Sequence, residues 1–447
     1  MFPPFPQAIA KNYCLELISR IEKGEIELFQ TARESEERKG QGIMIGSLVC
    51  IDKNTSKRVV LYALSGNAKE LKYADGITPD ENCRFVPSIV STQKINDALQ
   101  ENDAVIHQLT DKINSLVDGD ERREMIIERT KLTDISLQRV FDLYSFTRFN
   151  GTIISLNDII SLHNGKLPPT GTGDCCAPKL LSFAFENNLQ IVSMAEVFYG
   201  NDTKNKVNGQ TYAPCDERCG YILPEILGLE ILYRDNDIVV VNKQSGVLSV
   251  PGRGEDKIDS IETRLKNLFP ECITQPAVHR LDMETSGILI LALNKEAHSN
   301  LNKQFESGVV QKKYEALLDG IVRGKGEGHI ELKFRLDIDN RPHQIYDEVY
   351  GKLGITDWKK IDVETYKNPL SEETKKVTRV EFIPRTGRTH QLRLHSSDVR
   401  GLGIPIVGDT LYGNYTAGER LMLHAYYIKF LHPVSGQEME FVCKVPF

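Results

Sequence analysis

The sequence AVHRLDMETSG, residues 277–287, places a histidine, an arginine and an aspartate within four positions, directly before the branched apolar run ILILAL (288–293). An apolar run of this length is typical of a buried strand, and the alternation of side chains along a strand puts Arg280 and Asp282 on one side. A carboxylate beside an apolar strand is costly unless a cation or hydrogen-bond donors stabilise it. The stretch therefore predicts a positioned carboxylate next to a rigid strand.

A second polar segment, RTGRTHQLRLH (385–395), is the densest cationic segment in the C-terminal half of the chain. An arginine from this segment can hold Asp282 ionised at neutral pH, because a nearby cation favours the charged form of a carboxyl group. Taken alone, each segment is better explained by a structural salt bridge with surface arginines. Their combination is what points to a functional site.

The chain has 447 residues and a net charge of −7, with 40% hydrophobic and 26% charged residues. This length predicts two or three domains of a globular protein. The acidic total gives no support for a basic nucleic-acid-binding surface, but it does not exclude a local basic groove. No apolar run approaches the roughly 20 residues that span a bilayer, so we expect no membrane association. Residues 1–17 lack a signal-peptide pattern, and with nine cysteines this predicts reduced thiols in a cytoplasmic protein.

The sequence predicts two domains, residues 1–221 and residues 222–447, because its texture changes at that point. The first is predicted to be a separate mixed α/β region, with strands at 42–52 and 58–66. The second is predicted to be α+β, with a mixed, mostly antiparallel β-sheet. Its expected elements are strands at 230–243, 287–295, 312–322, 378–387 and 424–433, and helices at 259–269 and 295–307.

A helical hairpin is predicted at about residues 93–146. Its first helix carries a heptad seam with one polar break at Asn102, formed by Ile95, Leu99, Ile106, Leu109, Ile113 and Leu116. We favour a hairpin that packs within its own domain, since three heptads are short for a dimerising coiled coil. The chain is therefore expected to be a monomer, or a dimer through these N-terminal helices.

The loop-rich residues 165–220 contain four cysteines: Cys175, Cys176, Cys215 and Cys219. They can be interpreted as a zinc set, but adjacent cysteines seldom both reach one metal, and a zinc knuckle usually shows two Cys-x-x-Cys pairs. We therefore expect buried thiols and no metal site here. A metal-dependent activity of residues 1–221 is the less favoured alternative.

Four motifs in the C-terminal half, taken together and in this order, resemble those of the RluA-type pseudouridine synthases. They are HRLDMETSG (279–287), KKYEALLDG (312–320), RTGRTHQLRLH (385–395) and PIVGDTLYG (405–413). Residues 232–253 resemble the family's opening strands, and SVPGR and NRPHQ (340–344) resemble the subgroup named for RluA itself. The resemblance covers about residues 222–447. Gln244, in place of the family's usual proline, and a longer segment after His395 are departures from the pattern.

The resemblance implies a synthase that detaches uracil from its ribose, turns it and rejoins it through carbon, without metal or cofactor. It implies that Asp282 is the catalytic carboxylate, as nucleophile or base, that Tyr314 stacks on the target base, and that Arg393 pairs with Asp282. Arg280 is implied to fill the vacancy left by a flipped uridine, with a phosphate clamp as the alternative. The other residues expected to bind RNA are His279, Arg388, His390, Gln391 and Arg341.

The expected function is the isomerisation of specific uridines in structured RNA, either large-subunit rRNA, the anticodon arm of tRNA, or both. RNA is the expected partner. The alternative is a non-catalytic RNA-binding protein or RNA chaperone that keeps the synthase fold. The presence of Asp282, Tyr314 and Arg393 together argues against it. The resemblance does not extend to residues 1–221, for which we expect a substrate-docking or dimerising role.

Overall fold

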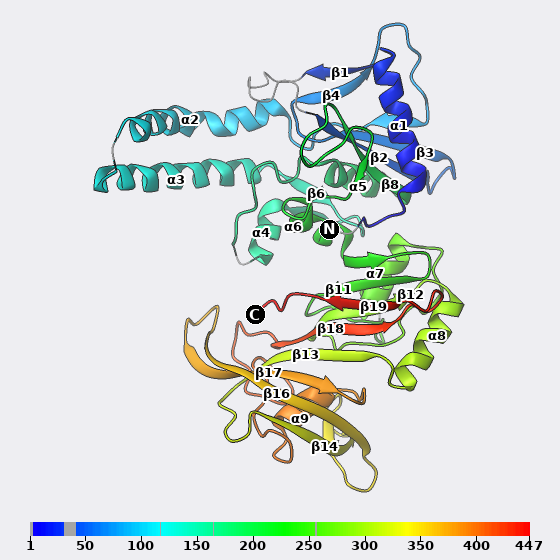
Figure 1. Ribbon diagram of the computed structural model, residues 1–447, viewed down its shortest axis with the longest axis vertical. Helices are drawn as coiled ribbons and strands as arrows, with labels where there is room; N and C mark the ends of the chain where they lie inside the picture. Colours follow the sequence, from blue (N-terminus) through cyan, green and yellow to red (C-terminus); the bar gives the residue numbers. More distant parts are fainter. Residues whose placement is uncertain (1–2, 31–41, 117, 164, 255–256) are drawn as a thin grey trace. The chain divides into compact units, whose positions relative to one another are not determined.

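The structure is a computed structural model that describes residues 3–30, 42–116, 118–163, 165–254 and 257–447. The chain forms two compact units, Met1–Glu230 and Ile231–Phe447 (Figure 1). The boundary expected after residue 221 lies inside a helix, Cys219–Leu227, which packs against another helix of the first unit, Cys176–Glu186. Among the described residues, no helix combines the length and the apolar character needed to cross a membrane.

The first unit is built on a five-stranded sheet with two additional two-stranded pairs. Its described elements are α1 (Ala8–Glu22), β1 (Ile26–Gln30), β2 (Ile43–Asp52), β3 (Arg58–Leu64), β4 (Lys69–Tyr73), β5 (Cys83–Phe85), α2 (Thr92–Ser115), α3 (Asp120–Phe141), β6 (Ser145–Thr147), β7 (Ile153–Ser155), α4 (Leu156–Leu162), α5 (Cys176–Glu186), β8 (Leu189–Tyr199), β9 (Thr211–Tyr212) and α6 (Cys219–Leu227). The strand order of the main sheet is β5-β3-β2-β8-β9, which confirms the two strands expected at 42–52 and 58–66.

The alternation of side chains along β2 determines the layers of this unit. Ile45 and Val49 pack against α1 on one face of the sheet. Gly46 faces α5 on the other, where an added Cβ would lie 2.5 Å from the Cβ of Cys176. The sheet is therefore covered by α1 on one side and by α5 on the other, and glycine at position 46 allows α5 to approach closely.

The helices α2 and α3 form the expected hairpin (Figure 1). Leu109 and Ile113 of the predicted seam are buried against α3. Asn102, the polar break in the seam, donates from Nδ2 to Oγ of Ser136 on α3 at 3.1 Å. The polar residue in the seam therefore has a hydrogen-bond partner on the facing helix, so its side chain is not left unpaired between the two helices. Dimerisation through these helices stays a prediction.

The second unit consists of one ten-stranded sheet with helices beside it. Its described elements are β10 (Glu230–Arg234), β11 (Ile238–Lys243), α7 (Ile261–Leu268), β12 (Ser286–Ala292), α8 (Lys295–Glu306), β13 (Gln311–Leu318), β14 (Glu327–Leu336), β15 (Gln344–Tyr346), β16 (Lys352–Lys367), β17 (Thr374–Pro384), α9 (Gln391–Ser397), β18 (Leu423–Leu431) and β19 (Glu438–Val442). The order is β10-β11-β12-β18-β13-β17-β16-β14-β15, with β19 beside β18. The pair β12–β18 is parallel and the other described registers are antiparallel, which confirms the expected sheet.

The register at the centre of this sheet brings two distant motifs together. Gly287 of β12 lies opposite Ala425 of β18, and Ala425 lies opposite Tyr314 of β13. Gly287 has φ +121°, and an added Cβ would lie 2.3 Å from the carbonyl oxygen of Ala425. Only glycine permits this approach, so the motif that contains Asp282 requires its final residue.

Candidate active site

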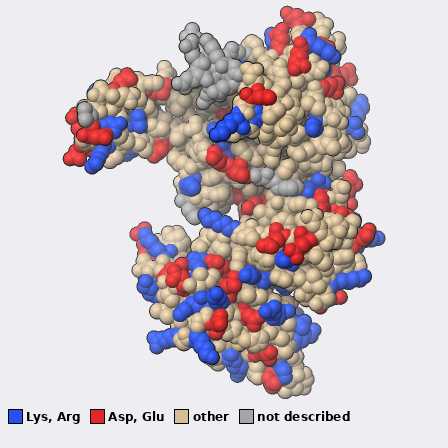
Figure 2. Space-filling view, in the orientation of Figure 1, with Lys and Arg blue, Asp and Glu red and all other residues tan. Residues whose placement is uncertain are grey.

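The second unit contains a cleft of about 710 Å³ beside the loop that carries Asp282. Among its lining residues, five are basic and two are acidic: Arg280, Lys312, Arg385, Arg388 and Arg393 against Asp282 and Glu306. Figure 2 shows Lys and Arg side chains spread over the second unit with acidic groups between them. The cleft is therefore locally basic even though the whole chain carries a net charge of −7.

Asp282 lies in the segment directly before β12, with 21% of its side chain exposed. Two serines from the segment after β11 hold this segment in place. Oγ of Ser249 donates to the carbonyl of Leu281 at 2.6 Å and accepts its N–H at 3.0 Å. Ser245 donates to the carbonyl of Glu284 at 2.6 Å. The backbone on both sides of Asp282 is thus fixed by hydrogen bonds before any substrate binds.

Lys243 is fully buried beneath the same segment. Its Nζ donates to the carbonyls of Gln244 at 2.9 Å, Val247 at 2.6 Å and Met283 at 2.9 Å. Burial lowers the pKa of Lys243 to about 7, whereas the charge of Asp282 raises it. Three carbonyl acceptors use all three protons of an ammonium group, so this arrangement favours the charged form. Lys243 thus places a cation close to Asp282.

Tyr314 lines the cleft together with Asp282. It lies on β13 and packs against the apolar cluster that contains Phe382. Burial raises the pKa of the Tyr314 hydroxyl well above its ordinary value of 10.0, and the charge of Asp282 raises it further. The phenol therefore stays protonated at neutral pH, and its ring is held by the sheet.

Arg393 is buried at the start of α9, but its ion pairs differ from the expected one. Nε and Nη2 donate to Oδ2 and Oδ1 of Asp409 at 2.9 and 2.6 Å, and Nη2 also donates to Oε2 of Glu284 at 3.0 Å. Burial lowers the pKa of Arg393, but the bonds to Asp409 and the charges of Asp409, Asp282 and Glu284 outweigh this and raise it.

The direct Arg393–Asp282 pair that we expected is therefore replaced, among the described residues, by a bidentate pair with Asp409. The physical reason is that Asp409 is fully buried and requires a cation, and the guanidinium fork satisfies both of its oxygens. Arg393 reaches the catalytic segment through Glu284, two residues after Asp282. Between Arg393 and Asp282 themselves, the described residues show a charge interaction and no direct hydrogen bond or ion pair.

Nε2 of His390 lies 4.0 Å from Oδ1 of Asp282, and the two groups form an ion pair only when the imidazole is protonated. His390 adopts a left-handed backbone with φ 55°, which is uncommon for a residue other than glycine. Its Nδ1 lies 2.9 Å from the hydroxyl of Tyr412, and that hydroxyl accepts the N–H of Gln344 at 2.7 Å. The Tyr412 proton is then free to go to Nδ1, which leaves Nε2–H facing Asp282. Burial lowers the pKa of His390, and the charge of Asp282 opposes this.

Arg280 and Arg388 line the cleft and are exposed, as RNA-contacting cations would be. Within the described part of the chain, Arg280 has no hydrogen bond or ion pair, whereas Arg388 donates from Nε to the carbonyl of Leu353 at 3.4 Å. Both guanidinium groups are therefore placed where a backbone phosphate or an unpaired base can reach them.

His279 has a different environment from these arginines. Its Nε2 accepts the N–H of Ile290 at 2.9 Å, and its ring stacks on Phe305 with centroids 4.6 Å apart. Burial lowers the pKa of His279 to about 3. His279 is thus neutral at physiological pH, and its ring packs against Phe305 in the wall of the cleft.

Gln391, which is buried, and Arg341, which is not a lining residue, differ from the exposed cations of the cleft. The Gln391 side chain is buried, and it accepts from Thr386 at 2.8 Å and donates to the Ile355 carbonyl and Thr356 hydroxyl at 2.9 Å each. It therefore anchors the cationic segment to the sheet. Arg341 lies in the exposed turn between β14 and β15 and is not among the described residues that line the cleft. RNA contacts of these two residues stay predictions.

Comparison with known proteins identifies the family of the chain. The sequence model of the family described as RNA pseudouridylate synthase matches residues 237–398. The chain is 41% identical over 222 residues to the dual-specificity RNA pseudouridine synthase RluA of Haemophilus influenzae, which covers 49% of this chain and 94% of that protein. It is 38% identical over 230 residues to the RluA of Escherichia coli K12, covering 51% and 98%. The chain belongs to the RNA pseudouridine synthase family. It is accordingly an isomerase that acts on uridine in RNA.

A solved structure of human RNA pseudouridylate synthase domain containing 1 also matches, with 33% identity, a TM-score of 0.40, and coverage of 49% of this chain and 84% of that one. The family match at residues 237–398 contains Asp282, Tyr314 and Arg393. It begins after the first unit ends, so the described cleft lies in the synthase part of the chain.

Sequence reasoning missed three residues of the site, and it considered a fourth, Arg385, only as one of the cations of residues 385–395. Lys243 seemed to be only the end of a strand, and Asp409 lies in a quoted motif without an assigned role. Lys312 lines the cleft, with Nζ 5.8 Å from the Phe305 ring centroid. Arg385 lines it as well and donates to Asp357 at 2.7 Å. All but Lys243 lie inside the catalytic-domain motifs, so a search for every charge in each motif would have found them.

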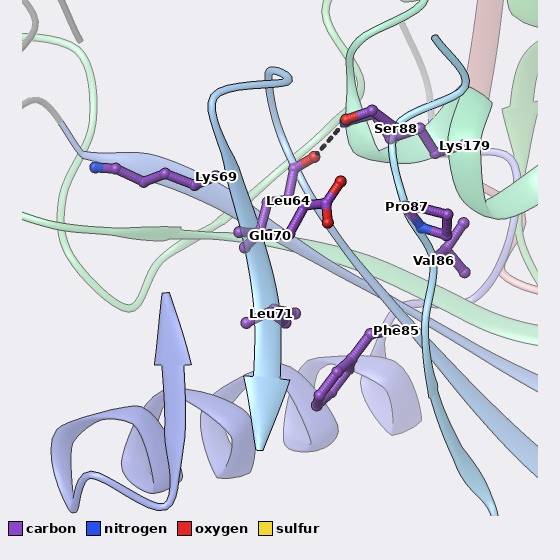
Figure 3. Close-up of a pocket in the computed structure, with 9 residues that line it drawn as sticks. All are labelled: Leu64, Lys69, Glu70, Leu71, Phe85, Val86, Pro87, Ser88 and Lys179. Carbon is purple, nitrogen blue, oxygen red and sulfur yellow. Dashed lines mark hydrogen bonds between the residues drawn. The ribbon is translucent and has the colours of Figure 1, made fainter. Parts of the chain in front are cut away.

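A second, much smaller cavity of about 50 Å³ lies in the first unit (Figure 3). Lys179 is its buried cation, and Nζ already donates to the carbonyls of Leu64 at 3.0 Å and Gly66 at 2.5 Å. Burial lowers the pKa of Lys179. Because its donors are occupied and the space is that of a water molecule or two, this cavity does not compete with the cleft as a substrate site.

Proposed function

We propose that this synthase isomerises specific uridines in large-subunit rRNA, in tRNA, or in both, with Asp282 as the catalytic carboxylate, and that it does so in the cytoplasm. The observation that carries the proposal is the basic cleft in which Asp282 and Tyr314 lie together among five cationic side chains. The relatives from Haemophilus influenzae and Escherichia coli are described as dual-specificity synthases, which supports more than one RNA substrate.

The described side chains suit a uridine that has left its stack. The phosphate backbone is attracted by Arg388, Lys312 and Arg385, because neutralised phosphates supply most of the affinity for RNA. The uracil ring then stacks on Tyr314, and Arg280, which is exposed at the cleft, fills the vacancy in the RNA. A phosphate contact is the alternative role for Arg280. The cost of unstacking selects uridines in loops and other weakly stacked positions.

Asp282 acts on the extruded nucleoside as a nucleophile or as a base, and both roles require the ionised form. Three features of the site position the carboxylate or place a polar or positive group near it. His390 presents an N–H at 4.0 Å, Lys243 adds a buried positive charge, and hydrogen bonds fix the backbone on both sides. The phenol of Tyr314 remains protonated, so it can give its proton to N1 of the uracil and take up the proton that leaves C5 after rejoining, which returns the hydroxyl to its starting state.

The test is to map pseudouridines in rRNA and tRNA from a strain that lacks the gene. One or a few positions should lose the modification, and wild-type protein should restore it, whereas Asp282→Asn should not. Positions modified equally with Asp282→Asn would contradict the catalytic role and favour the RNA-chaperone alternative. Positions restricted to one RNA class would settle which substrate the cleft accepts.

A further inference from the structure

Three cysteines from separate segments of the first unit meet in space. The Sγ atoms of Cys175, Cys215 and Cys219 all lie within 4.8 Å of one another. Cys175 directly precedes α5, Cys215 follows β9, and Cys219 is the first residue of α6. Their spacing along the chain predicted no metal site, because it lacks two short pairs. The fold supplies the third ligand from 40 residues upstream of Cys215, which linear spacing does not show.

The adjacent pair of cysteines divides between two environments. Cys176 is fully buried, and its Sγ donates to the carbonyls of Met44 at 3.3 Å and Ala63 at 3.4 Å on the sheet. Cys175 points to the cluster instead. The objection that neighbouring cysteines cannot both reach one ion therefore does not apply, since only one of them is required.

The backbone around the cluster favours negative charge on sulfur. Two helices of 11 and 9 residues, α5 and α6, begin at the cluster with Cys175 as the N-cap of one and Cys219 in the first turn of the other. The N–H of Cys219 donates to Sγ of Cys215 at 3.4 Å. Helix N-termini and N–H···S bonds both stabilise thiolates, which are the form that binds metal.

We propose that Cys175, Cys215 and Cys219 bind one zinc ion. Zinc–sulfur bonds of about 2.3 Å in a tetrahedral site put two sulfurs about 3.8 Å apart, which fits three atoms mutually within 4.8 Å. An iron–sulfur cluster places several atoms between its thiolates and needs them farther apart. Binding forms three Zn–S bonds and releases three protons to solvent, and no oxidant or reductant is involved.

The fourth position of the ion would be taken by water. Among the described residues, the group that meets at this point contains these three cysteines and no histidine or carboxylate. Cys215 is exposed, Cys175 is half-buried and Cys219 is buried, so one side of the cluster faces solvent. The ion would link the loop before α5, the loop after β9 and the start of α6, and so stabilise the end of the first unit.

The first experiment measures zinc in the full-length chain after purification under reducing conditions. We expect about one zinc per chain, and its loss in Cys215→Ser and in Cys219→Ser. The matched controls are Cys83→Ser and Cys272→Ser, because both thiols are half-buried and lie outside the cluster. These controls should keep the zinc. Zinc that remains in the double variant Cys215→Ser/Cys219→Ser would overturn the proposal.

A second experiment does not depend on metal uptake in the cell or on how the variants fold. Reduced, metal-free wild-type chain is titrated with Co²⁺ and then with Zn²⁺. We expect one equivalent of Co²⁺ to bind with the thiolate charge-transfer absorption of a tetrahedral site, and Zn²⁺ to displace it. Absence of this absorption would overturn the proposal. So would a thiol count in the unfolded, non-reduced chain of two fewer than the nine cysteines, which would show a disulfide.

Discussion

The cleft of the second unit and the cysteine cluster of the first are assembled in opposite ways. The cleft takes most of its residues from short contiguous motifs, so that His279, Arg280 and Asp282 are neighbours both in sequence and in the lining of the cleft. The cluster takes one residue from each of three segments, and Cys175 lies 40 positions before Cys215. A site built from contiguous segments leaves a signature in the sequence, whereas a site gathered by the fold leaves scattered residues.

The two sites also stabilise negative charge differently. In the second unit the buried carboxylate of Asp409 is paired with Arg393, and the half-buried Asp282 has Nε2 of His390 at 4.0 Å. In the cluster the sulfurs are next to helix N-termini and backbone N–H groups. Removing a partner from the cleft should therefore have large local effects, and removing a bound ion from the cluster should mainly affect its own unit.

The largest expected effect is on catalysis in the cleft. Asp282→Asn should lower the single-turnover rate at saturating RNA by about a thousandfold or more, because the carboxamide cannot attack or accept a proton. The matched control is Glu306→Gln, the other acidic residue that lines the cleft, which should change the rate only a few-fold. A rate within tenfold of wild type for Asp282→Asn would show that Asp282 is not the catalytic carboxylate.

Arg393→Met tests whether the main role of Arg393 is to pair with the buried carboxylate of Asp409. The variant leaves a buried carboxylate unpaired, so the free energy of unfolding should fall by about 3–5 kcal/mol. Arg385→Met, an exposed arginine of the same segment, should cost far less. Urea denaturation measures both. If Arg393→Met kept the wild-type stability and lost only activity, Arg393 would act on Asp282 directly.

Acid should destabilise the second unit through buried histidines. Burial lowers the pKa of His395 and of His424 to about 4, from an ordinary value of 6.5. The unfolded chain therefore binds more protons than the folded chain between these values, and the free energy of unfolding falls as the pH drops below 6.5. Each histidine should contribute roughly 1 kcal/mol of loss between pH 7 and 5.5.

His395→Leu should remove about a third of this pH dependence, because His279, with a pKa lowered to about 3, contributes as well as His424. Among the described residues, neither ring nitrogen of His395 has a hydrogen-bond partner, so the replacement breaks no hydrogen bond. The comparison uses urea denaturation of wild type and variant at both pH values. Parallel losses in the two proteins would show that other groups cause the acid sensitivity.

The smallest expected effect is that of removing the first unit. Residues 230–447 should fold alone with an unfolding midpoint close to that of the second unit in the full chain, and should keep some activity on an RNA stem-loop. The fragment contains all of β10. An insoluble or unfolded fragment would show that the two units share more than the chain connection.

Sequence reasoning predicted several strands of the second unit and the class of reaction. It did not predict which acidic residue pairs with Arg393. The strands β11, β12, β13 and β18 are apolar runs with clear limits, and they were found. The long strand β16 was not, because its residues alternate between partly buried and exposed without an apolar run. Arg393 pairs with Asp409 because the Asp409 side chain is fully buried. The burial of a single side chain cannot be deduced from the composition of the sequence.

The close approach of Gly287 to Ala425 has a consequence for how this enzyme can diversify. The distance between the Asp282 segment and Tyr314 is set by hydrogen-bonded backbone across β18, with no side chain at position 287 to adjust it. The rim of the cleft, by contrast, comes from an exposed loop, residues 385–389. New RNA preferences can therefore arise by rebuilding this loop while the reacting groups keep their spacing, whereas a single methyl group at position 287 would separate them.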